Sequence, residues 1–483
     1  MMMSKINKVN LKKLIYYLKR NGLRDTFLAA LERLQENRQQ IYEYQDISIK
    51  VWEEQHNWSK ENKSIFFSIV VPAYHTRERH LRAMIESVLD QSYENFELLI
   101  ADAGNEERNK VIVKSYGDDR IQYIPLQKNS GIADNTNEAL RYAKGDYIGL
   151  LDHDDLLTKD ALFEMAVRIK QYESAGKELQ LIYSDEDKCD DAGKRYYEPH
   201  RKHDFNLDLI LSNNYICHFM MVKAKLIKEL GLRKEFDGAQ DYDLVLRCIR
   251  EIYLCLQNKE NETIAISPDK RNSSILKYPG EVPICHIPKV LYHWRCHQQS
   301  TAENPQSKQY AYEAGGRAIR AFLFDMQIVG DVSNTKHLGF YRIHYKPDML
   351  SQRMDVGAIG GKILGKHNKI TGGIYSADGT CPYQGIYKGY SGYMHLASLN
   401  QEAYAIDIRL MQIRPELFDT VNEIVAKYTK TDEEQLQIQD QVLDVSHLSL
   451  SETQYRMLSI RICEKFHELG YRVVWTPDWM KRL

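Results

Sequence analysis

The chain lacks the features that mark several specialised classes of protein. Its 483 residues include only eight cysteines, which follow no paired spacing, and no long uninterrupted apolar run. The scattered cysteines indicate reduced thiols in the cytoplasm rather than a disulfide framework. Without an apolar run of about 18 residues, we expect no membrane-spanning helix. The charged N-terminus lacks an apolar core and a small-residue cleavage site, so no signal peptide is expected either.

Neither sign of charge dominates the whole chain. Lys and Arg number 65 against 67 Asp and Glu, a net charge of -2, so nucleic acid is not an expected partner. No Gly-x-Gly-x-x-Gly follows the first predicted strand, which argues against a dinucleotide site. "GAIGGKI" (357–363) is one residue short of a phosphate loop and has Ile363 where Ser or Thr is required.

The first 24 residues differ from the rest in charge. They contain no acid and seven basic residues: Lys5, Lys8, Lys12, Lys13, Lys19, Arg20 and Arg24. Four apolar residues fall among them at helical spacing: Leu11, Leu14, Ile15 and Leu18. Such a basic amphipathic helix either lies on an anionic membrane surface or packs as a cap on the main domain. The sequence leaves both alternatives open.

Strands and helices are predicted to alternate from residue 66 onward. Apolar runs typical of buried strands occupy 66–74, 96–104, 121–125 and 146–151. Helical patterns lie between them near 79–91, 105–116 and 131–143. This alternation predicts an α/β fold with right-handed βαβ units and a parallel sheet. Ligands of such sheets bind beyond the carboxyl ends of the strands, so the residues at those ends should converge on one crevice.

Three carboxylates follow the strand at 146–151. Asp152, Asp154 and Asp155 lie within four residues, and like charges this close repel each other unless a cation intervenes. Mg²⁺ and Mn²⁺ prefer carboxylate oxygens and leave positions open for phosphate oxygens. Asp152 and Asp154 therefore indicate a metal–diphosphate site, whereas Asp155 is interpreted as a cap or a structural acid. A second acidic stretch, "YSDEDK" (183–188), is predicted to end another apolar strand.

Two further stretches carry ionisable residues. A helix predicted over 237–251 has Asp241 and Asp243 in its first turn, where the helix dipole favours carboxylates. A strand predicted from residue 284 ends at His293-Trp294-Arg295. Cys and His residues are dense there (Cys285, His286, His293, Cys296, His297), but their spacing fits no standard zinc module. A single histidine completing an oxygen-rich divalent site is the preferred interpretation.

Several of these stretches occur together in a fixed order over residues 65 to 325. They are "FSIVVPAYHTRERHLRAMIESVLDQSYENFELLIADAG", "LLDHDD", "IYSDEDK", "GAQDYDLVLR" and "VLYHWR". This set resembles the family 2 glycosyltransferases with the GT-A fold, of the type that builds rhamnan and other cell-surface polysaccharides. The resemblance implies an inverting transfer from a nucleotide sugar, with Mn²⁺ or Mg²⁺ as cofactor. The acceptor would be a saccharide or a lipid-linked saccharide.

The resemblance also implies roles for individual residues. Asp241 matches the catalytic base, and Asp154 with His293 matches the residues that hold the metal and the leaving diphosphate. The nucleotide sugar would be held by Pro72, Ala73, Tyr74, Asp102 and Asp152. Asp102 favours a UDP- or dTDP-sugar. Two positions depart from the family pattern: Ala103 replaces a second Asp, and Gln240 replaces the Glu before the base.

Three regions are expected: a basic helical region (1–64), a GT-A catalytic domain (65–330) and a C-terminal α/β region (331–483). In the last, "GFYRIHYKPDML" (339–350) is interpreted as the start of a linker. Residues 403–421 echo 215–230, which indicates a degenerate acceptor half of a second transferase domain without its own acids. An unrelated α/β appendage is the alternative. The polar insertion at 257–282 is interpreted as an acceptor-side loop or plain surface.

The predicted enzyme adds one sugar or a few, because the Gln-x-x-Arg-Trp motif of processive synthases is absent. We expect it in the cytoplasm, with peripheral contact to the inner face of the membrane. Three other functions are alternatives. A nucleotidyltransferase would carry a Gly-rich phosphate loop after its first strand. The stretch at that place here, "VPAYHTRERH", contains no glycine. A glycoside hydrolase would use two carboxylates without a nucleotide. The third is a non-catalytic partner module of an active transferase.

Overall fold

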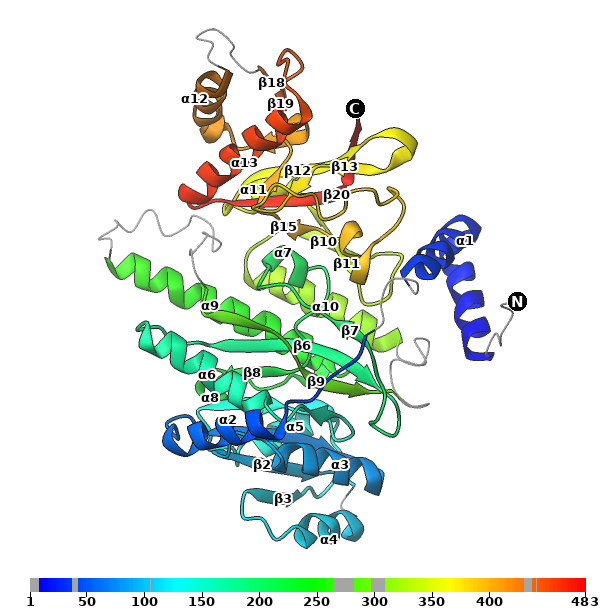
Figure 1. The fold of residues 1–483 in the computed structure, drawn as a ribbon, viewed down its shortest axis with the longest axis vertical. Coiled ribbons are helices and arrows are strands. Elements are labelled where there is room, and N and C mark those ends of the chain that lie inside the picture. The colour runs from blue at the N-terminus through cyan, green and yellow to red at the C-terminus, as the bar shows by residue number, and fades with distance from the viewer. Residues whose placement is uncertain are drawn as a thin grey trace.

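The computed structural model describes residues 8–36, 42–104, 106–263, 282–296, 309–429, 437–439 and 441–483. Predictions about His297 and most of the 257–282 insertion lie outside these residues. In Figure 1 the main sheet and its helices, coloured blue to green, form the lower body of the molecule. The C-terminal region, yellow to red, lies above it, and helix α1 (Lys8–Glu36) lies to one side.

The first half of the main sheet follows the predicted alternation. Its strands are β1 Phe67–Ala73, β2 Phe96–Asp102, β3 Ile121–Pro125 and β4 Tyr147–Leu150. Its helices are α3 Glu78–Leu89, α4 Glu107–Ser115 and α5 Ile132–Leu140. Every residue of β2 is buried, as expected for a parallel strand covered on both faces. The predicted strands and helices of this half are confirmed, with ends shifted by a few residues.

The second half completes the sheet with strands of both directions. Its elements are β5 Leu156–Leu157, α6 Ala161–Ser174, β6 Leu181–Cys189, β7 Tyr196–His200, α7 Leu207–Ile210, β8 Met220–Lys223, α8 Ala224–Leu230, α9 Gln240–Thr263, β9 Ile284–Arg295 and α10 Gln309–Asp325. The strand order is β3-β2-β1-β4-β8-β6-β9-β5, with β7 on β6. Strands β3, β2, β1 and β4 are parallel, and so are β6 and β9, whereas β8 runs antiparallel to both of its neighbours.

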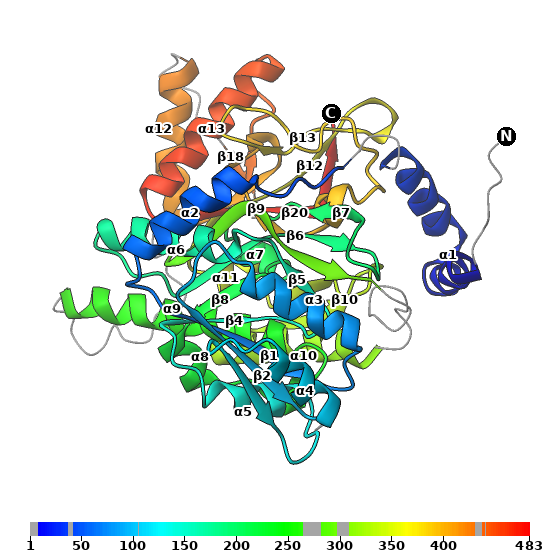
Figure 2. The same ribbon diagram turned by 60° about the horizontal axis from the view of Figure 1, so that its bottom comes forward.

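Helices cover both faces of this sheet. Apolar residues of α3, α4 and α6 share one buried cluster with Phe67, Ile69 and Val71 of β1. Residues of α5, α8, α9 and α10 share the other cluster with Val70 of the same strand. Figure 2 shows α3 on the near side of the strands after the molecule is turned. Alternate residues of β1 thus supply two cores, which confirms the predicted α/β fold.

One prediction about strand ends is wrong. The acids of "YSDEDK" were expected after a strand, but β6 continues through them to Cys189. Asp185, Glu186 and Asp187 are each less than a tenth exposed. They are tolerated inside the strand because each has a basic or histidine partner, as charges need when they are buried. Those partners come from distant segments, so the local sequence does not reveal them.

The C-terminal region forms its own sheet. Its strands are β12 Val356–Leu364, β13 Ile370–Gly372, β15 Gln401–Glu402, β17 Met411–Ile413, β18 Gln437–Gln439, β19 Val442–Asp444 and β20 Arg472–Arg482. Its order is β15-β20-β12-β17-β19-β18, with β13 on β12. Helices α12 (Phe418–Thr429) and α13 (Glu452–Glu468) pack on it. A capping box between Ser451 and Gln454 starts α13.

The predicted linker at 339–350 is instead partly a strand. β10 (Gly330–Asn334) and β11 (Tyr341–Tyr345) form an antiparallel hairpin. Tyr341 is 3% exposed, and its backbone N–H donates to the carbonyl of Ser212 at 2.8 Å. The segment is ordered because it pairs with the preceding strand, β10, and because it packs on the main body. The composition of the segment alone does not predict these contacts.

Buried polar contacts join the two sheets. The guanidinium of Arg353, fully buried, donates to Asp208 of α7 at 3.0 and 3.2 Å and to Asp355 at 2.8 and 2.9 Å. Helix α1 also docks on the C-terminal region. Arg20 donates to the carbonyl of Thr335 at 3.0 Å, and Glu32 accepts hydrogen bonds from residues 391 and 392. Within the described residues, we find no helix with the length and apolarity needed to cross a bilayer.

Candidate active site

The ends of β1 and β2 bring the predicted nucleotide-binding residues together. Ala73 lies opposite Asp102 in the parallel ladder, and the N–H of Ala103 donates to the carbonyl of Ala73 at 2.9 Å. Pro72 and Ala73 are the last residues of β1, and Tyr74, which follows them, is 46% exposed. An exposed aromatic ring at this edge of the sheet offers a flat apolar surface to a planar ligand.

Asp102 is held by three protein donors. Its Oδ1 accepts from the N–H of Gly104 at 2.9 Å, and its Oδ2 accepts from Asn109 at 3.0 Å and from the Tyr123 hydroxyl at 2.9 Å. The residue is fully buried. Burial, and then the hydrogen bond to Asp102, raises the pKa of Tyr123, which therefore keeps the proton that it donates. Asp102 thus fixes the shape of the loop after β2.

The acidic turn after β4 is anchored from β9. Asp155, 1% exposed, accepts from the Tyr292 hydroxyl at 2.5 Å and from the N–H of Arg295 at 2.7 Å. The Arg295 side chain donates to the carbonyl of Asp154 at 2.5 Å. Asp155 is therefore a structural acid, as one of the two interpretations had it. It ties the turn that carries Asp152 and Asp154 to the neighbouring strand.

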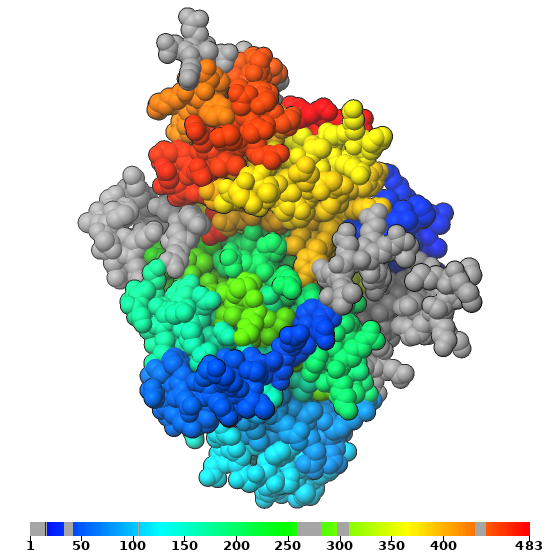
Figure 3. All heavy atoms as spheres, in the orientation of Figure 1, coloured from blue at the N-terminus to red at the C-terminus, as the bar shows by residue number. Residues whose placement is uncertain are grey.

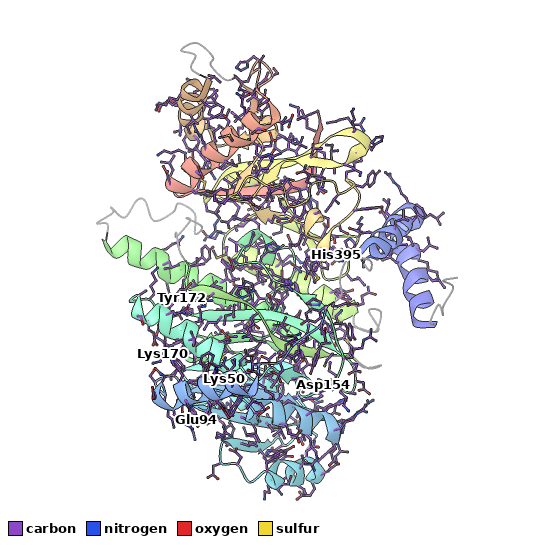
Figure 4. All side chains as sticks on the ribbon, in the orientation of Figure 1. Lys50, Glu94, Asp154, Lys170, Tyr172 and His395 are labelled. Carbon is purple, nitrogen blue, oxygen red and sulfur yellow. The ribbon has the colours of Figure 1, made fainter. Side chains whose placement is uncertain are left out.

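Asp152 and Asp154 are half-buried and share one electrostatic environment. Burial raises the pKa of Asp152 above its ordinary value; His218 opposes the rise, and the carboxylates of Asp154 and Asp241 add to it. The carboxylates of the predicted metal–diphosphate pair and of the predicted base therefore lie close enough to interact electrostatically. In Figure 4, Asp154 lies in the lower body, apart from His395 of the C-terminal region.

The donor set suits a hard divalent cation. Among the described residues, no group of three or more His, Cys, Asp and Glu side chains is arranged to hold a metal ion. A nucleotide-sugar site needs fewer protein ligands, since Mg²⁺ and Mn²⁺ are commonly held by one or two carboxylates together with phosphate oxygens and water. Two adjacent half-buried carboxylates, one with a raised pKa, are the kind of site that such a cation would neutralise.

Asp241 lies in the first turn of α9. Its Oδ2 accepts from the Asn214 side-chain amide at 2.8 Å, and the thiol of Cys217 lies 3.5 Å from the same oxygen. Gln240, which replaces the Glu of the family pattern, accepts from the N–H of Gly238 at 2.8 Å. Gln240 is thus engaged with the segment before the helix, and Asp241 is left half-buried.

Asp243 has a different role from Asp241. It is 1% exposed and forms ion pairs with Arg233 and Arg247. Arg247 also donates to the carbonyls of Leu230 and Gly231, at 2.9 and 2.7 Å. This network closes the segment between α8 and α9, so Asp243 is a structural acid rather than an alternative base.

His293 is enclosed by residues of the N-terminal segment and the β6–β7 hairpin. Its Nδ1 lies 2.5 Å from Asp187 Oδ1, and the Tyr42 hydroxyl donates to the other oxygen of Asp187 at 2.7 Å. The rings of Tyr44 and Tyr196 lie 4.5 and 4.2 Å from the imidazole, centroid to centroid. Only 3% of His293 is exposed, and Figure 3 shows the N-terminal segment as a blue band across the lower body.

Strand geometry separates His293 from the acidic turn. Neighbouring strand residues point to opposite faces, and Tyr292 already reaches Asp155 from β9. His293 faces the other way, and its hydrogen bond goes to Asp187. The structure therefore does not bring His293 to Asp154, and its role at the metal stays a prediction.

Three residues of the site were missed by sequence reasoning. Lys202 has a fully buried side chain whose Nζ lies 3.4 Å from Glu186. Burial alone would raise the pKa of Glu186, but Lys202, and next His200, lower it to about 2. The His218 ring stacks on Tyr292 at 4.7 Å. The signal for Glu186 was present in "YSDEDK", whereas Lys202 and His218 stand in stretches without a recognisable pattern.

Comparisons with known proteins place part of this chain in a known family. Residues 68–231 match the model of the family described as "Glycosyl transferase family 2". An uncharacterized protein of Sinorhizobium fredii is 38% identical over 53% of this chain and 25% of its own length. The O-antigen biosynthesis protein RfbC of Myxococcus xanthus is 30% identical over 58% of this chain and 19% of its own. An uncharacterized glycosyltransferase of Methanocaldococcus jannaschii is 29% identical over 38% of this chain and 65% of its own length.

These relatives are longer than the part of them that matches. The chain spans a quarter or less of the first two, at 25% and 19%. The family match covers β1 to α8, and so includes both the predicted nucleotide-binding edge and the acidic turn. Parallel βαβ units, an acidic pair at the end of β4 and the family match all indicate the same domain. Residues 68–231 are therefore a family 2 glycosyltransferase domain, and the sheet that contains them has the GT-A fold.

Proposed function

We propose that this protein is an inverting glycosyltransferase acting in the synthesis of a cell-surface polysaccharide. It moves a sugar from a nucleotide-sugar donor to a saccharide or lipid-linked acceptor. The observation that carries the proposal is that Asp152 and Asp154 of the family 2 domain interact electrostatically with each other and with Asp241 of α9. The name of RfbC, an O-antigen biosynthesis protein, supports the polysaccharide context.

Asp241 is the general base of this proposal. A sugar hydroxyl is a poor nucleophile, and Asp241 takes its proton as the oxygen attacks C1 of the donor sugar. The bond between C1 and the diphosphate oxygen breaks on the opposite side, and the nucleoside diphosphate leaves. A single displacement of this kind inverts the configuration at C1. One base and one donor site are sufficient for it.

Asp152 and Asp154 serve the diphosphate side. They would hold Mn²⁺ or Mg²⁺, which supplies positive charge against the charge that develops on the leaving diphosphate. His293 is proposed as a further ligand, and reaching Asp154 would require it to leave Asp187. The bend after β1, at Pro72, Ala73 and Tyr74, would receive the base and ribose, above the loop that Asp102 holds. This edge would suit a UDP- or dTDP-sugar.

Thermal shift with nucleotide sugars tests the donor site. UDP- and dTDP-sugars should raise the melting temperature in Mn²⁺, because a ligand that binds only the folded state stabilises it. EDTA and Asp154→Ala should each abolish most of that rise. Asp134→Asn, at a carboxylate on α5 that is 40% exposed and pairs with Lys234, is the matched control and should respond like wild type. Equal shifts with and without metal would contradict the assignment of Asp154.

We further propose that the protein works on the cytoplasmic face of the membrane, where α1 contacts anionic lipid. The motive is the seven basic residues without an acid in residues 1–24. The docking of Arg20 and Glu32 on the C-terminal region supports the competing cap interpretation for the later part of α1. Sedimentation with anionic vesicles should fall on deletion of residues 1–24 and in high salt. Equal sedimentation of both proteins would exclude membrane contact through α1.

A further inference from the structure

A short loop lies directly beside the candidate base. Residues Asn214 to His218, here called the 214–218 loop, lie between α7 and β8. Asn214 and Cys217 both approach Asp241, and both approach the same oxygen, Oδ2, at 2.8 and 3.5 Å. Among the described residues, none donates a hydrogen bond to Oδ1 of Asp241. The loop therefore holds one oxygen of the carboxylate and leaves the other available.

The orientation of the Asn214 amide is set by the loop itself. Its Oδ1 accepts from the backbone N–H of Cys217 at 3.4 Å. With the oxygen engaged in this way, the amide nitrogen faces Asp241 and donates to it. An aspartate in place of Asn214 would have the same shape but would present an oxygen to a carboxylate, so shape and hydrogen bonding can be separated by experiment.

Cys217 faces Asp241 as a protonated thiol. Burial, and then the charge of Asp241, raises the pKa of the Cys217 thiol well above its usual range. A thiol that keeps its proton can donate it in a weak hydrogen bond. The backbone of Cys217 has a φ of 29°, a left-handed value that costs energy for a residue other than glycine. Such strain persists only where the surroundings enforce it, commonly at functional sites.

A buried lysine, Lys202, holds the backbone of the 214–218 loop in this conformation. Lys202 Nζ donates to the carbonyl of Ile216 at 2.7 Å and to the carbonyl of His218. The same ammonium pairs with Glu186, and its side chain is fully buried. The ring of His218 stacks on Tyr292, with 12° between the planes. The 214–218 loop is thus fixed at its backbone by Lys202 and at its end by an aromatic stack.

We propose that Asn214 and Cys217 are positioning residues for the glycosyl transfer, which hold Oδ2 of Asp241 so that Oδ1 is presented to the acceptor hydroxyl. A carboxylate free to rotate would meet the hydroxyl less often in a productive geometry, and misalignment at a reacting group is costly. This inference rests on the proposed role of Asp241 as the base. It adds that the base is oriented by a loop outside α9.

Steady-state kinetics of matched variants test the proposal. Asn214→Asp keeps the shape, loses the amide donor and adds a negative charge beside Asp241, whereas Asn214→Ala loses both shape and donor, so kcat should fall about 10- to 100-fold in each. The KM for the donor sugar and the melting temperature should change little. Cys217→Ala should lower kcat a few-fold, and Cys217→Ser, which restores a donor of similar size, should recover it. Asn137→Ala is the control for loss of a half-buried amide, because Asn137 bonds the backbone of Leu232 away from the site.

A double variant shows whether the two residues act through Asp241. In an Asp241→Asn background, Asn214→Ala should cause no further loss of kcat, since residues that act as a unit are not additive. Wild-type kcat in Asn214→Asp, or losses that follow KM or melting temperature alone, would overturn the positioning role. Near-normal turnover in Asp241→Asn alone would instead overturn the proposed base. The two failures are therefore distinguishable.

Discussion

Two parts of the molecule share one arrangement of strands but differ in what the strands carry. In the main sheet, β6 lies between antiparallel β8 and parallel β9; in the C-terminal sheet, β12 lies between antiparallel β17 and parallel β20. The elements follow in the same chain order, with β7 and β13 antiparallel to the central strands. Leu181 faces Val222 in one sheet, and Ala358 faces Ile413 in the other.

The difference lies in the side chains. Where β6 pairs Glu186 with Tyr292 and Asp187 with His293, β12 pairs Ile363 with Lys481 and Leu364 with Arg482. The N-terminal residue of α13, Glu452, pairs with Arg409, whereas Asp241 at the start of α9 accepts a hydrogen bond from Asn214. The shared strand order supports the proposal that residues 331–483 derive from the acceptor half of a transferase domain. It also indicates that a sheet with this strand order forms without the acids of β6.

The strongest test of the comparison is removal of the acids from the first part. A protein with Asp154→Ala and Asp241→Asn should transfer no detectable sugar, since loss of the base alone should cost about 10² to 10⁴ in turnover. Radiolabelled donor and product chromatography measure this. Asp134→Asn is the control. Residual transfer in the double variant would mean that residues 331–483 contribute chemistry.

The contact between the two parts can be broken at Arg353. Arg353→Met leaves the buried carboxylates of Asp208 and Asp355 without their shared cation. Breaking a buried pair from one side costs about 3 to 5 kcal/mol, so the melting temperature should fall sharply. Arg141→Met, at a side chain that is 74% exposed, is the control. An unchanged melting temperature would show that the two sheets do not depend on this contact.

Acid should weaken the C-terminal part through two stacked histidines. The rings of His337 and His395 lie 3.6 Å apart. Burial, and then His395 and Lys336, lowers the pKa of His337 to about 2, and burial with Lys336 lowers that of His395 to about 4. A histidine in the unfolded chain titrates near pH 6.5. Below that pH the unfolded chain therefore binds protons at these histidines that the folded chain does not bind. Stability is therefore present above pH 6.5 and is lost as pH falls toward 4.

Urea unfolding at pH 7, 6 and 5 measures this loss, on the order of 1 kcal/mol per pH unit for each histidine. His395→Gln removes one of the two titrating groups and should flatten the dependence. His75→Gln, at a side chain that is 61% exposed, should leave the dependence unchanged. Identical slopes for wild type and His395→Gln would contradict the assignment.

The smallest expected effect concerns helix α1. Glu32 accepts hydrogen bonds from Ser391 and from the backbone of Gly392. Glu32→Gln keeps an acceptor and removes the charge, so the expected loss is about 1 kcal/mol. Glu32→Gln should speed amide hydrogen exchange in α1 and leave the main sheet unaffected. Glu138→Gln, at a surface carboxylate that is 46% exposed, is the control. Equal exchange in both variants would mean that Glu32 does not hold the helix in place.

Much of the site could be predicted from sequence because its residues follow local patterns. Asp152 and Asp154 come directly after an apolar strand, and Asp241 opens an amphipathic helix. The parallel ladder then brings Ala73 and Asp102 together without further information. The separate roles of Asp241 and Asp243 could not be predicted, because they depend on Asn214, Arg233 and other distant partners.

The sequence by itself determined the α/β alternation, the buried strands and the acids at their carboxyl ends, because hydrophobic periodicity and strand direction are local properties of the chain. Only the tertiary structure decided which acids are structural and which face the site. The deciding contacts join segments far apart in sequence: Tyr292 donates to the buried Asp155, Tyr44 packs on His293, and Lys202 donates to the backbone of the 214–218 loop. The charge state and the orientation of a carboxylate depend on such neighbours, which no local pattern specifies.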